Sequence, residues 1–139
     1  MNQTEKPKCL VVDDDVTFQV YLKVLLEKNG FEVKKTSGAE EAIQSLHKNN
    51  FDLIISDIEM PGMDGIEFIS AIKSNSKLSK IPVIFITNVS DNKIISKAFN
   101  LGVNGLIRKP FLSLYINRLY ELLTTRKDDP VWSDINHYY

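Results

Sequence analysis

Five short apolar runs alternate along this chain with longer segments in which apolar residues recur at the spacing of an α-helix. A strand, a crossover helix and a further strand pair in parallel, and the helices cover both faces of the sheet. We therefore predict an α/β fold with an open, doubly wound, parallel sheet of five strands. The expected strands are 9–12, 31–33, 51–56, 81–86 and 106–107, and the expected helices are 18–26, 38–49, 66–72, 94–99 and 114–123.

Local patterns assign structural roles to a few residues. Asp15 and Asp64 precede helical segments and are expected to act as N-caps, and Cys9 is expected to pack in the core. The pair Asn29-Gly30 is a typical helix end. The inward face of the first helix is predicted to consist of Phe18, Tyr21, Leu22, Leu25 and Leu26.

Composition narrows the class of protein. The 139 residues are 43% hydrophobic and 25% charged, which suits a single globular domain. The net charge of -1 gives no reason to expect direct nucleic-acid binding. No apolar run approaches the ~18 residues of a membrane helix, and the N-terminus lacks the apolar core of a signal peptide. One cysteine cannot form an internal disulfide, so a cytoplasmic location is expected.

Polar residues follow four of the five predicted strands. Asp13 and Asp14 come after the first, Asp57 after the third, Thr87 after the fourth and Lys109 after the fifth. In an open parallel sheet, ligands bind beyond the carboxyl ends of the strands, where the strand order reverses. We therefore expect these five side chains to meet in one shallow site.

The chemistry of this group fits a phosphoryl acceptor. Three carboxylates held together repel one another, and a hard divalent cation offsets the repulsion. Oxygen ligands without a nearby histidine favour Mg²⁺. A carboxylate can act as a nucleophile and form an aspartyl phosphate. The Lys109 ammonium and the Thr87 hydroxyl can both bind phosphoryl oxygens.

Four motifs carry a resemblance to a known family. In chain order they are VVDDD at 11–15, ISDIEMPGMDG at 55–65, IPVIFITN at 81–88 and IRKP at 107–110. With these motifs, the chain resembles the receiver domain of two-component response regulators, and in particular the single-domain chemotaxis regulators. The resemblance implies a flavodoxin-like fold with strand order 2-1-3-4-5. It also implies a receiver domain at 8–126, an N-terminal extension at 1–7 and a C-terminal tail at 127–139.

The resemblance also implies roles for the site residues. Asp57 corresponds to the phosphorylated acid, and Thr87 and Lys109 correspond to the hydroxyl and the lysine that assist the transfer. Mg²⁺ is the implied cofactor. Its implied ligands are Asp13, Asp14, Asp57 and the backbone carbonyl of Glu59.

A receiver of this kind is not an enzyme with a separate substrate. It accepts its phosphoryl group from a sensor histidine kinase or a histidine phosphotransfer protein, and it catalyses only its own transfer and dephosphorylation. It then signals to a downstream protein through the face formed by the fourth helix, fifth strand and fifth helix. The target is unknown, and a phosphorylation-dependent dimer is left open. No contact with nucleic acid or membrane is expected.

Three positions depart from the family's commonest residues. Asn88 stands where a small residue is frequent, and Leu106 stands where Tyr or Phe usually changes rotamer on phosphorylation. An aromatic switch therefore cannot operate here in the usual way. The carboxylate of Glu59 adds a charge beside the site, and we expect Glu59 and Val89 to influence the lifetime of the phosphoryl group.

The same residues argue against three other functions. A phosphohydrolase with an aspartyl nucleophile would carry its nucleophile after the first strand and a cap over its substrate, and this sequence fits neither requirement. An interaction module that does not use phosphorylation would not need the acid pair, Asp57, Thr87 and Lys109 together. A flavin-binding protein would need a glycine-rich phosphate loop instead of acidic strand ends.

Overall fold

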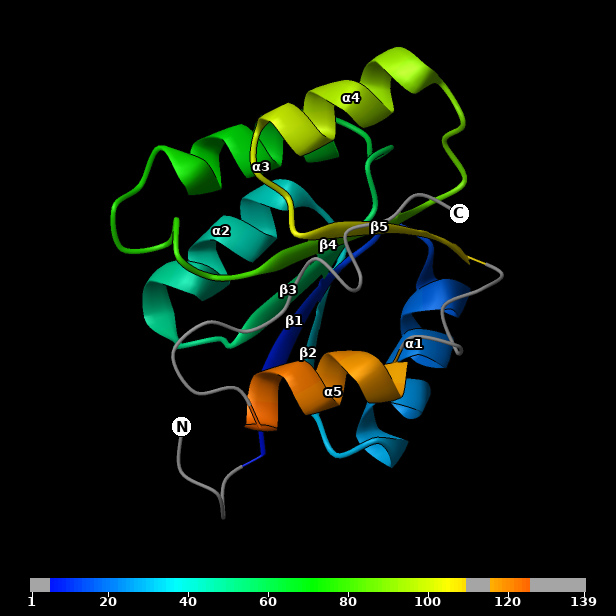
Figure 1. Cartoon of the computed structure of the whole chain (residues 1–139), viewed down its shortest axis with the longest axis vertical. Helices are drawn as coiled ribbons and strands as arrows, with labels where there is room; N and C mark the ends of the chain where they lie inside the picture. Colours follow the sequence, from blue (N-terminus) through cyan, green and yellow to red (C-terminus); the bar gives the residue numbers. More distant parts are fainter. Residues whose placement is uncertain (1–5, 110–115, 126–139) are drawn as a thin grey trace.

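The computed structural model describes residues 6–109 and 116–125, and within them it has the predicted doubly wound architecture (Figure 1). Five parallel strands pair in the order β2-β1-β3-β4-β5, which confirms the expected strand order. The strands are β1 (Lys8–Val12), β2 (Glu32–Thr36), β3 (Leu53–Ser56), β4 (Val83–Thr87) and β5 (Gly105–Arg108). The helices are α1 (Val16–Lys28), α2 (Ala39–Lys48), α3 (Gly65–Lys73), α4 (Asn92–Asn100) and α5 (Ile116–Thr125).

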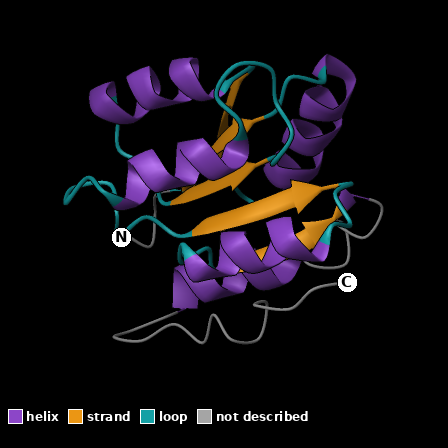
Figure 2. Cartoon of the chain, turned by 90° about the horizontal axis from the view of Figure 1, so that it is seen from above, coloured by secondary structure: helices purple, strands orange, loops and turns teal. Residues whose placement is uncertain are grey.

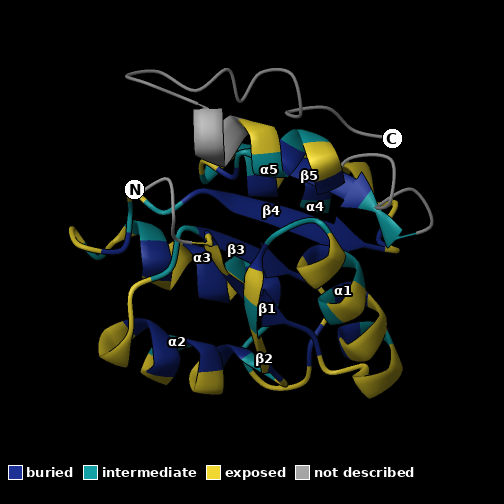
Figure 3. Ribbon diagram, turned by 90° about the horizontal axis from the view of Figure 1, so that it is seen from below, coloured by how far each residue is buried: buried dark blue, intermediate teal, exposed yellow. Residues whose placement is uncertain are grey.

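Helices cover both faces of the sheet, α2, α3 and α4 on one and α1 and α5 on the other (Figures 1 and 2). Side chains along a strand alternate between these faces. In β1, Leu10 and Val12 pack toward α2 and α3, whereas Cys9 and Val11 pack toward α1 and α5. The sheet therefore separates two apolar cores, and its central strands β1, β3 and β4 are buried except at Lys8 (Figure 3).

The single cysteine lies in the second of these cores, as predicted. Cys9 has no exposed surface, and its burial raises the pKa of the thiol, which therefore stays protonated. Among the described residues, no helix is long and apolar enough to cross a membrane. The predicted tail, most of the predicted N-terminal extension and the predicted start of the last helix at Leu114 lie outside the described residues.

Three strands begin later than the apolar runs suggested. Phe31 was predicted in β2, but its N–H donates to the Leu26 carbonyl at the end of α1, and β2 begins at Glu32. Residues 51–52 precede β3, where the carboxylate of Asp52 accepts a hydrogen bond from the Lys8 N–H. Residues 81–82 precede β4, because Pro82 has no N–H to contribute to the ladder. In each case the apolar run starts one or two residues before the first residue of the hydrogen-bonded strand.

The prediction for the inward face of α1 was wrong at one position. Tyr21 is 48% exposed, whereas Gln19 is buried beside Leu22 and Leu26. The error has a physical reason, since α1 is apolar on its outer face as well. Its exposed large apolar side chains are Val16, Val20, Tyr21 and Val24. Apolar spacing alone cannot identify the buried face of such a helix.

Candidate functional site

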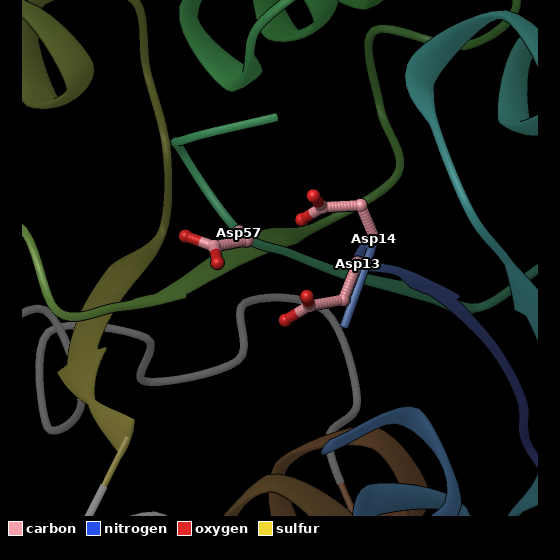
Figure 4. A group of neighbouring side chains, drawn as sticks. All are labelled: Asp13, Asp14 and Asp57. Carbon is pink, nitrogen blue, oxygen red and sulfur yellow. The ribbon is translucent and has the colours of Figure 1, made fainter. Parts of the chain in front are cut away.

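Three carboxylates lie together at the carboxyl ends of β1 and β3. These strands are neighbours in register, with Val12 opposite Ser56, so the residues that follow them emerge side by side. Each of Asp13, Asp14 and Asp57 offers an oxygen within 4.8 Å of the other two (Figure 4). The sequence prediction of an acidic cluster at this edge of the sheet is therefore confirmed.

The carboxylate of Asp57 is held by backbone and side-chain groups. Its Oδ1 accepts hydrogen bonds from the N–H groups of Ile58, at 2.6 Å, and Glu59, at 3.3 Å. Its backbone N–H donates to the Val12 carbonyl at 2.9 Å. Its Oδ2 lies 2.9 Å from the Lys109 Nζ. Together these contacts fix the position of Asp57, a residue that is 7% exposed.

Lys109 joins the carboxylates from the end of β5. Its Nζ lies 3.2 Å from Asp13 Oδ2 in addition to its contact with Asp57, and its side chain is 15% exposed. Burial by itself lowers the pKa of Lys109, but the hydrogen bond that its ammonium donates to Asp57 and the charges of Asp57 and Asp13 raise it overall. The ammonium therefore stays charged beside the carboxylates.

The environment of Asp13 favours an additional cation. Burial raises its pKa, as does the negative charge of Asp57, although the Asp15 N–H, 2.9 Å from Asp13 Oδ1, and Lys109 act in the opposite direction. A raised pKa means that the fold disfavours the full negative charge of this cluster. A divalent cation would relieve that cost. Asp14 is exposed, so the cluster opens to solvent.

Two further predicted site residues are Thr87, which ends β4 beside β3, and Glu59, which contacts Asp57. Thr87 is buried, and its Oγ1 accepts a hydrogen bond from the Val89 N–H at 3.1 Å. The hydroxyl makes no hydrogen bond to the three carboxylates among the described residues. Glu59 is exposed and contacts Asp57 through its N–H, so the role of its carbonyl as a metal ligand stays a prediction.

Sequence reasoning missed a buried glutamine behind the site. The Gln19 amide nitrogen donates to the Asp13 carbonyl and lies within hydrogen-bonding distance of Thr36 O, at 3.1 Å, and Ser37 Oγ, at 3.3 Å. Gln19 thereby ties the loop after β1 to the loop after β2. A polar residue between apolar ones on α1 gave no sign of this role, because two of its three partners lie 17 and 18 residues further along the chain.

The loop after Asp57 turns tightly into α3. Asp64 accepts a hydrogen bond from the Glu67 N–H, and the Glu67 carboxylate accepts one from the Asp64 N–H, so the predicted N-cap is confirmed as a capping box. Gly65 donates to the Ile58 carbonyl at 2.7 Å. A Cβ atom at Gly65 would lie 2.5 Å from the Asp57 carbonyl oxygen. This glycine therefore permits the close approach of α3 to the loop that carries Asp57 and Ile58.

A groove opens beside the acidic cluster. It has a volume of about 660 Å³ and lies between the loop after β3, the start of α3 and α4. Asp14 and Glu59 line it, together with Asp64, Glu67 and Lys97. Small molecules in solution can therefore approach the cluster from this side.

Comparison with known proteins identifies this arrangement. The family model described as "Response regulator receiver domain" matches residues 9–124. The chemotaxis protein CheY of Pseudomonas aeruginosa is 34% identical over 122 residues, which are 86% of this chain and 97% of that protein. A probable transcriptional regulator, ycf29, of Pyropia yezoensis is 38% identical over 104 residues, 75% of this chain. The chain spans only 47% of the length of that second relative.

Solved structures agree with these sequence matches. The chemotaxis protein CheY4 of Vibrio cholerae superposes with a TM-score of 0.78 at 28% identity, over 86% of this chain and 99% of that one. A putative response regulator from Chloroflexus aurantiacus superposes with a TM-score of 0.80 at 28% identity, over 88% of this chain and 100% of that one. Both likenesses cover most of this chain.

Proposed function

This chain belongs to the response regulator receiver domain family, a family of signalling domains, and we propose that Asp57 accepts a phosphoryl group from a phosphohistidine. One observation carries the proposal. The Asp57 carboxylate is held by two backbone N–H groups and Lys109, beside Asp13 and Asp14, at the edge of the sheet where strand order reverses. We assign the receiver unit to 8–126, with 1–7 and 127–139 as flanking segments.

The transfer follows from the contacts of Asp57. Its Oδ1 is held by backbone N–H groups, which leaves Oδ2 to attack phosphorus once Lys109 turns toward the phosphoryl oxygens. The bond from phosphorus to the donor imidazole nitrogen breaks, and its electron pair remains on that nitrogen. Because the Thr87 hydroxyl accepts from the Val89 N–H, its own proton is available to a phosphoryl oxygen. The chain thus catalyses its own phosphorylation.

The donor set of the cluster fits Mg²⁺. Asp13, Asp14 and Asp57 would hold the ion through carboxylate oxygens, and Glu59 would add its backbone carbonyl. Bound there, Mg²⁺ supplies positive charge that offsets the negative charge on the phosphoryl oxygens. The raised pKa of Asp13, caused by its burial and by Asp57, supports a cation in this position.

Intact mass measurement tests the proposed function. The chain is incubated with acetyl phosphate, once with Mg²⁺ and once with a chelator. We expect the mass of one phosphoryl group to be gained only with Mg²⁺. A wild-type chain that gains no phosphoryl group from acetyl phosphate or from a phosphorylated histidine protein would refute the proposal. It would then favour the interaction module that works without phosphorylation.

The side chain of Glu59 is expected to lengthen the life of the phosphoryl group. Its carboxylate is exposed beside Asp57 and adds negative charge where water must attack an already anionic group. Replacing it in Glu59→Asn should speed dephosphorylation about two- to tenfold, from a charge interaction near 1 kcal/mol at a solvated site. The measurement is the decay of the phosphorylated mass after the donor is removed. The control is Glu40→Gln, which removes an exposed carboxylate from α2 and should decay like the wild type. Equal decay rates in Glu59→Asn and the wild type would contradict the predicted effect of Glu59.

The outer face of α1 is a suitable surface for the phosphohistidine donor. Val16, Val20, Tyr21 and Val24 form an exposed apolar stripe that begins directly after the acidic loop. We expect Val20→Lys to slow transfer from a phosphorylated histidine phosphotransfer protein about tenfold or more, because a charge would have to be buried against the donor. Phosphorylation by acetyl phosphate, which needs no docking, should not change. Equal slowing with both donors would contradict this assignment.

The output is proposed to pass through the face of α4, β5 and α5. Leu106 of β5 is fully buried in the core on the α4 side, so a change there would shift packed aliphatic side chains and not an aromatic ring. We propose a cytoplasmic domain whose target is another protein, with no contact to nucleic acid or membrane of its own. A dimer that depends on phosphorylation is compatible with the same face.

A further inference from the structure

The ammonium of Lys109 lies over the ring of Phe18, with Nζ 4.5 Å from the ring centroid. This contact is additional to its contacts with Asp13 and Asp57. We propose that Phe18 is a positioning residue for phosphoryl transfer, which holds the Lys109 ammonium beside Asp57 through the face of its ring. The proposal rests on the proposed function of Asp57 and assigns a new residue to that site.

Phe18 is itself fixed by the loop that carries the acidic pair. It occupies the first turn of α1, and its N–H donates to the Asp15 carboxylate at the N-cap at 3.1 Å. Its ring packs against the core between the sheet, α1 and α5, and lies 5.8 Å from the ring of Tyr21. The ring is therefore tied to the same short segment as Asp13 and Asp14.

An aromatic ring suits this position because it attracts a cation without adding a charge. The face of the ring has a negative quadrupole, which favours an ammonium placed over it. A further carboxylate would attract Lys109 as well, but it would also compete as a metal ligand. A ring cannot ligate Mg²⁺. Phe18 thus holds Lys109 at the site and leaves the metal ligands unchanged.

Two opposite effects follow from this arrangement. The ammonium contacts oxygens of Asp13 and Asp57 that Mg²⁺ would also use. Loss of the ring weakens the hold on the ammonium, so Mg²⁺ should bind more tightly to Phe18→Leu. At saturating Mg²⁺, phosphorylation of Phe18→Leu should be slower, because Lys109 is no longer held within reach of the phosphoryl oxygens. General damage to the site would weaken both properties.

The experiment measures Mg²⁺ affinity by calorimetry and the rate of phosphorylation by acetyl phosphate. For Phe18→Leu, we expect Mg²⁺ binding to tighten and the rate to fall, each by about two- to thirtyfold, the range given by cation–π contacts between exposed and desolvated sites. Phe18→Trp, with the strongest ring for such a contact, should retain wild-type behaviour. Phe51→Leu, which removes a partly buried ring in the other core just before β3, is the matched control.

A series of fluorinated phenylalanines at position 18 separates the ring's charge distribution from its shape. Mg²⁺ affinity should rise stepwise with each added fluorine, because fluorine weakens the quadrupole. Mg²⁺ affinity that is the same in the wild type, Phe18→Leu and the fluorinated chains would overturn the proposal. If the wild type accepts no phosphoryl group, the proposed function fails, and the Mg²⁺ comparison still decides the role of Phe18.

Discussion

Asp57→Asn is expected to abolish phosphorylation by acetyl phosphate, because a neutral amide cannot act as the nucleophile. Asparagine keeps the size of the side chain and one oxygen that can accept from the N–H groups of Ile58 and Glu59. The loss is therefore chemical and not structural. Intact mass after incubation with Mg²⁺ and acetyl phosphate is the measurement, and the variant should show no phosphorylated species.

Asp64→Asn is the matched control for Asp57→Asn. Asp64 lies seven residues further along the chain and lines the groove beside the acidic cluster, but it is not a member of the cluster. Asparagine is as good an N-cap as aspartate, so α3 should begin as before. The control should be phosphorylated like the wild type. Phosphorylation of Asp57→Asn at the wild-type rate would contradict the assignment of Asp57.

Gly65→Ala is expected to lower the free energy of unfolding by about 1–3 kcal/mol or more, the usual cost of overpacking. The added Cβ would lie 2.5 Å from the Asp57 carbonyl oxygen and 2.6 Å from the Ile58 Cα, and both are backbone atoms. Alanine favours a helix over glycine by only about 0.5–1 kcal/mol, so the steric cost outweighs the gain in propensity. Urea unfolding measures the change.

The loop that must move in Gly65→Ala is the one that carries Asp57. We therefore expect the folded fraction of this variant to be phosphorylated more slowly than the wild type. Gly38→Ala is the control, because a Cβ there meets nothing within 4 Å and the backbone is extended. Its stability should change by less than about 1 kcal/mol. A Gly65→Ala chain as stable as Gly38→Ala would refute the close approach of α3 to this loop.

The sequence was most informative where one physical requirement dominates. Every residue of β4 is buried, and the continuous apolar run in the sequence predicted this strand. Only its start differs, because β4 begins after Pro82. The ends of parallel strands share one edge of the sheet, so the sequence predicted that Asp13, Asp14 and Asp57 lie together, as they do in the structure. The resemblance to a receiver then supplied the strand order, which spacing alone does not give.

Features that depend on tertiary contacts were not predictable from spacing. The buried face of α1 was misjudged at Tyr21, because α1 is apolar on both sides. Gln19 contacts the backbone carbonyls of the loop after β1 and of the last residue of β2, which is 17 residues away. The contact of Lys109 with Phe18 joins residues at opposite ends of the domain sequence. Such pairings follow from the folded arrangement of β1, α1 and β5.

Identification of the phosphorylated residue is the most direct measurement of what this site does. The chain is phosphorylated with acetyl phosphate and Mg²⁺, reduced with borohydride, which converts an aspartyl phosphate to homoserine, and digested for peptide mass spectrometry. We predict homoserine at position 57 and at no other position. Homoserine at Asp13 or Asp14, or a phosphoryl group found only on another type of residue, would contradict the assignment of Asp57 as the phosphoryl acceptor.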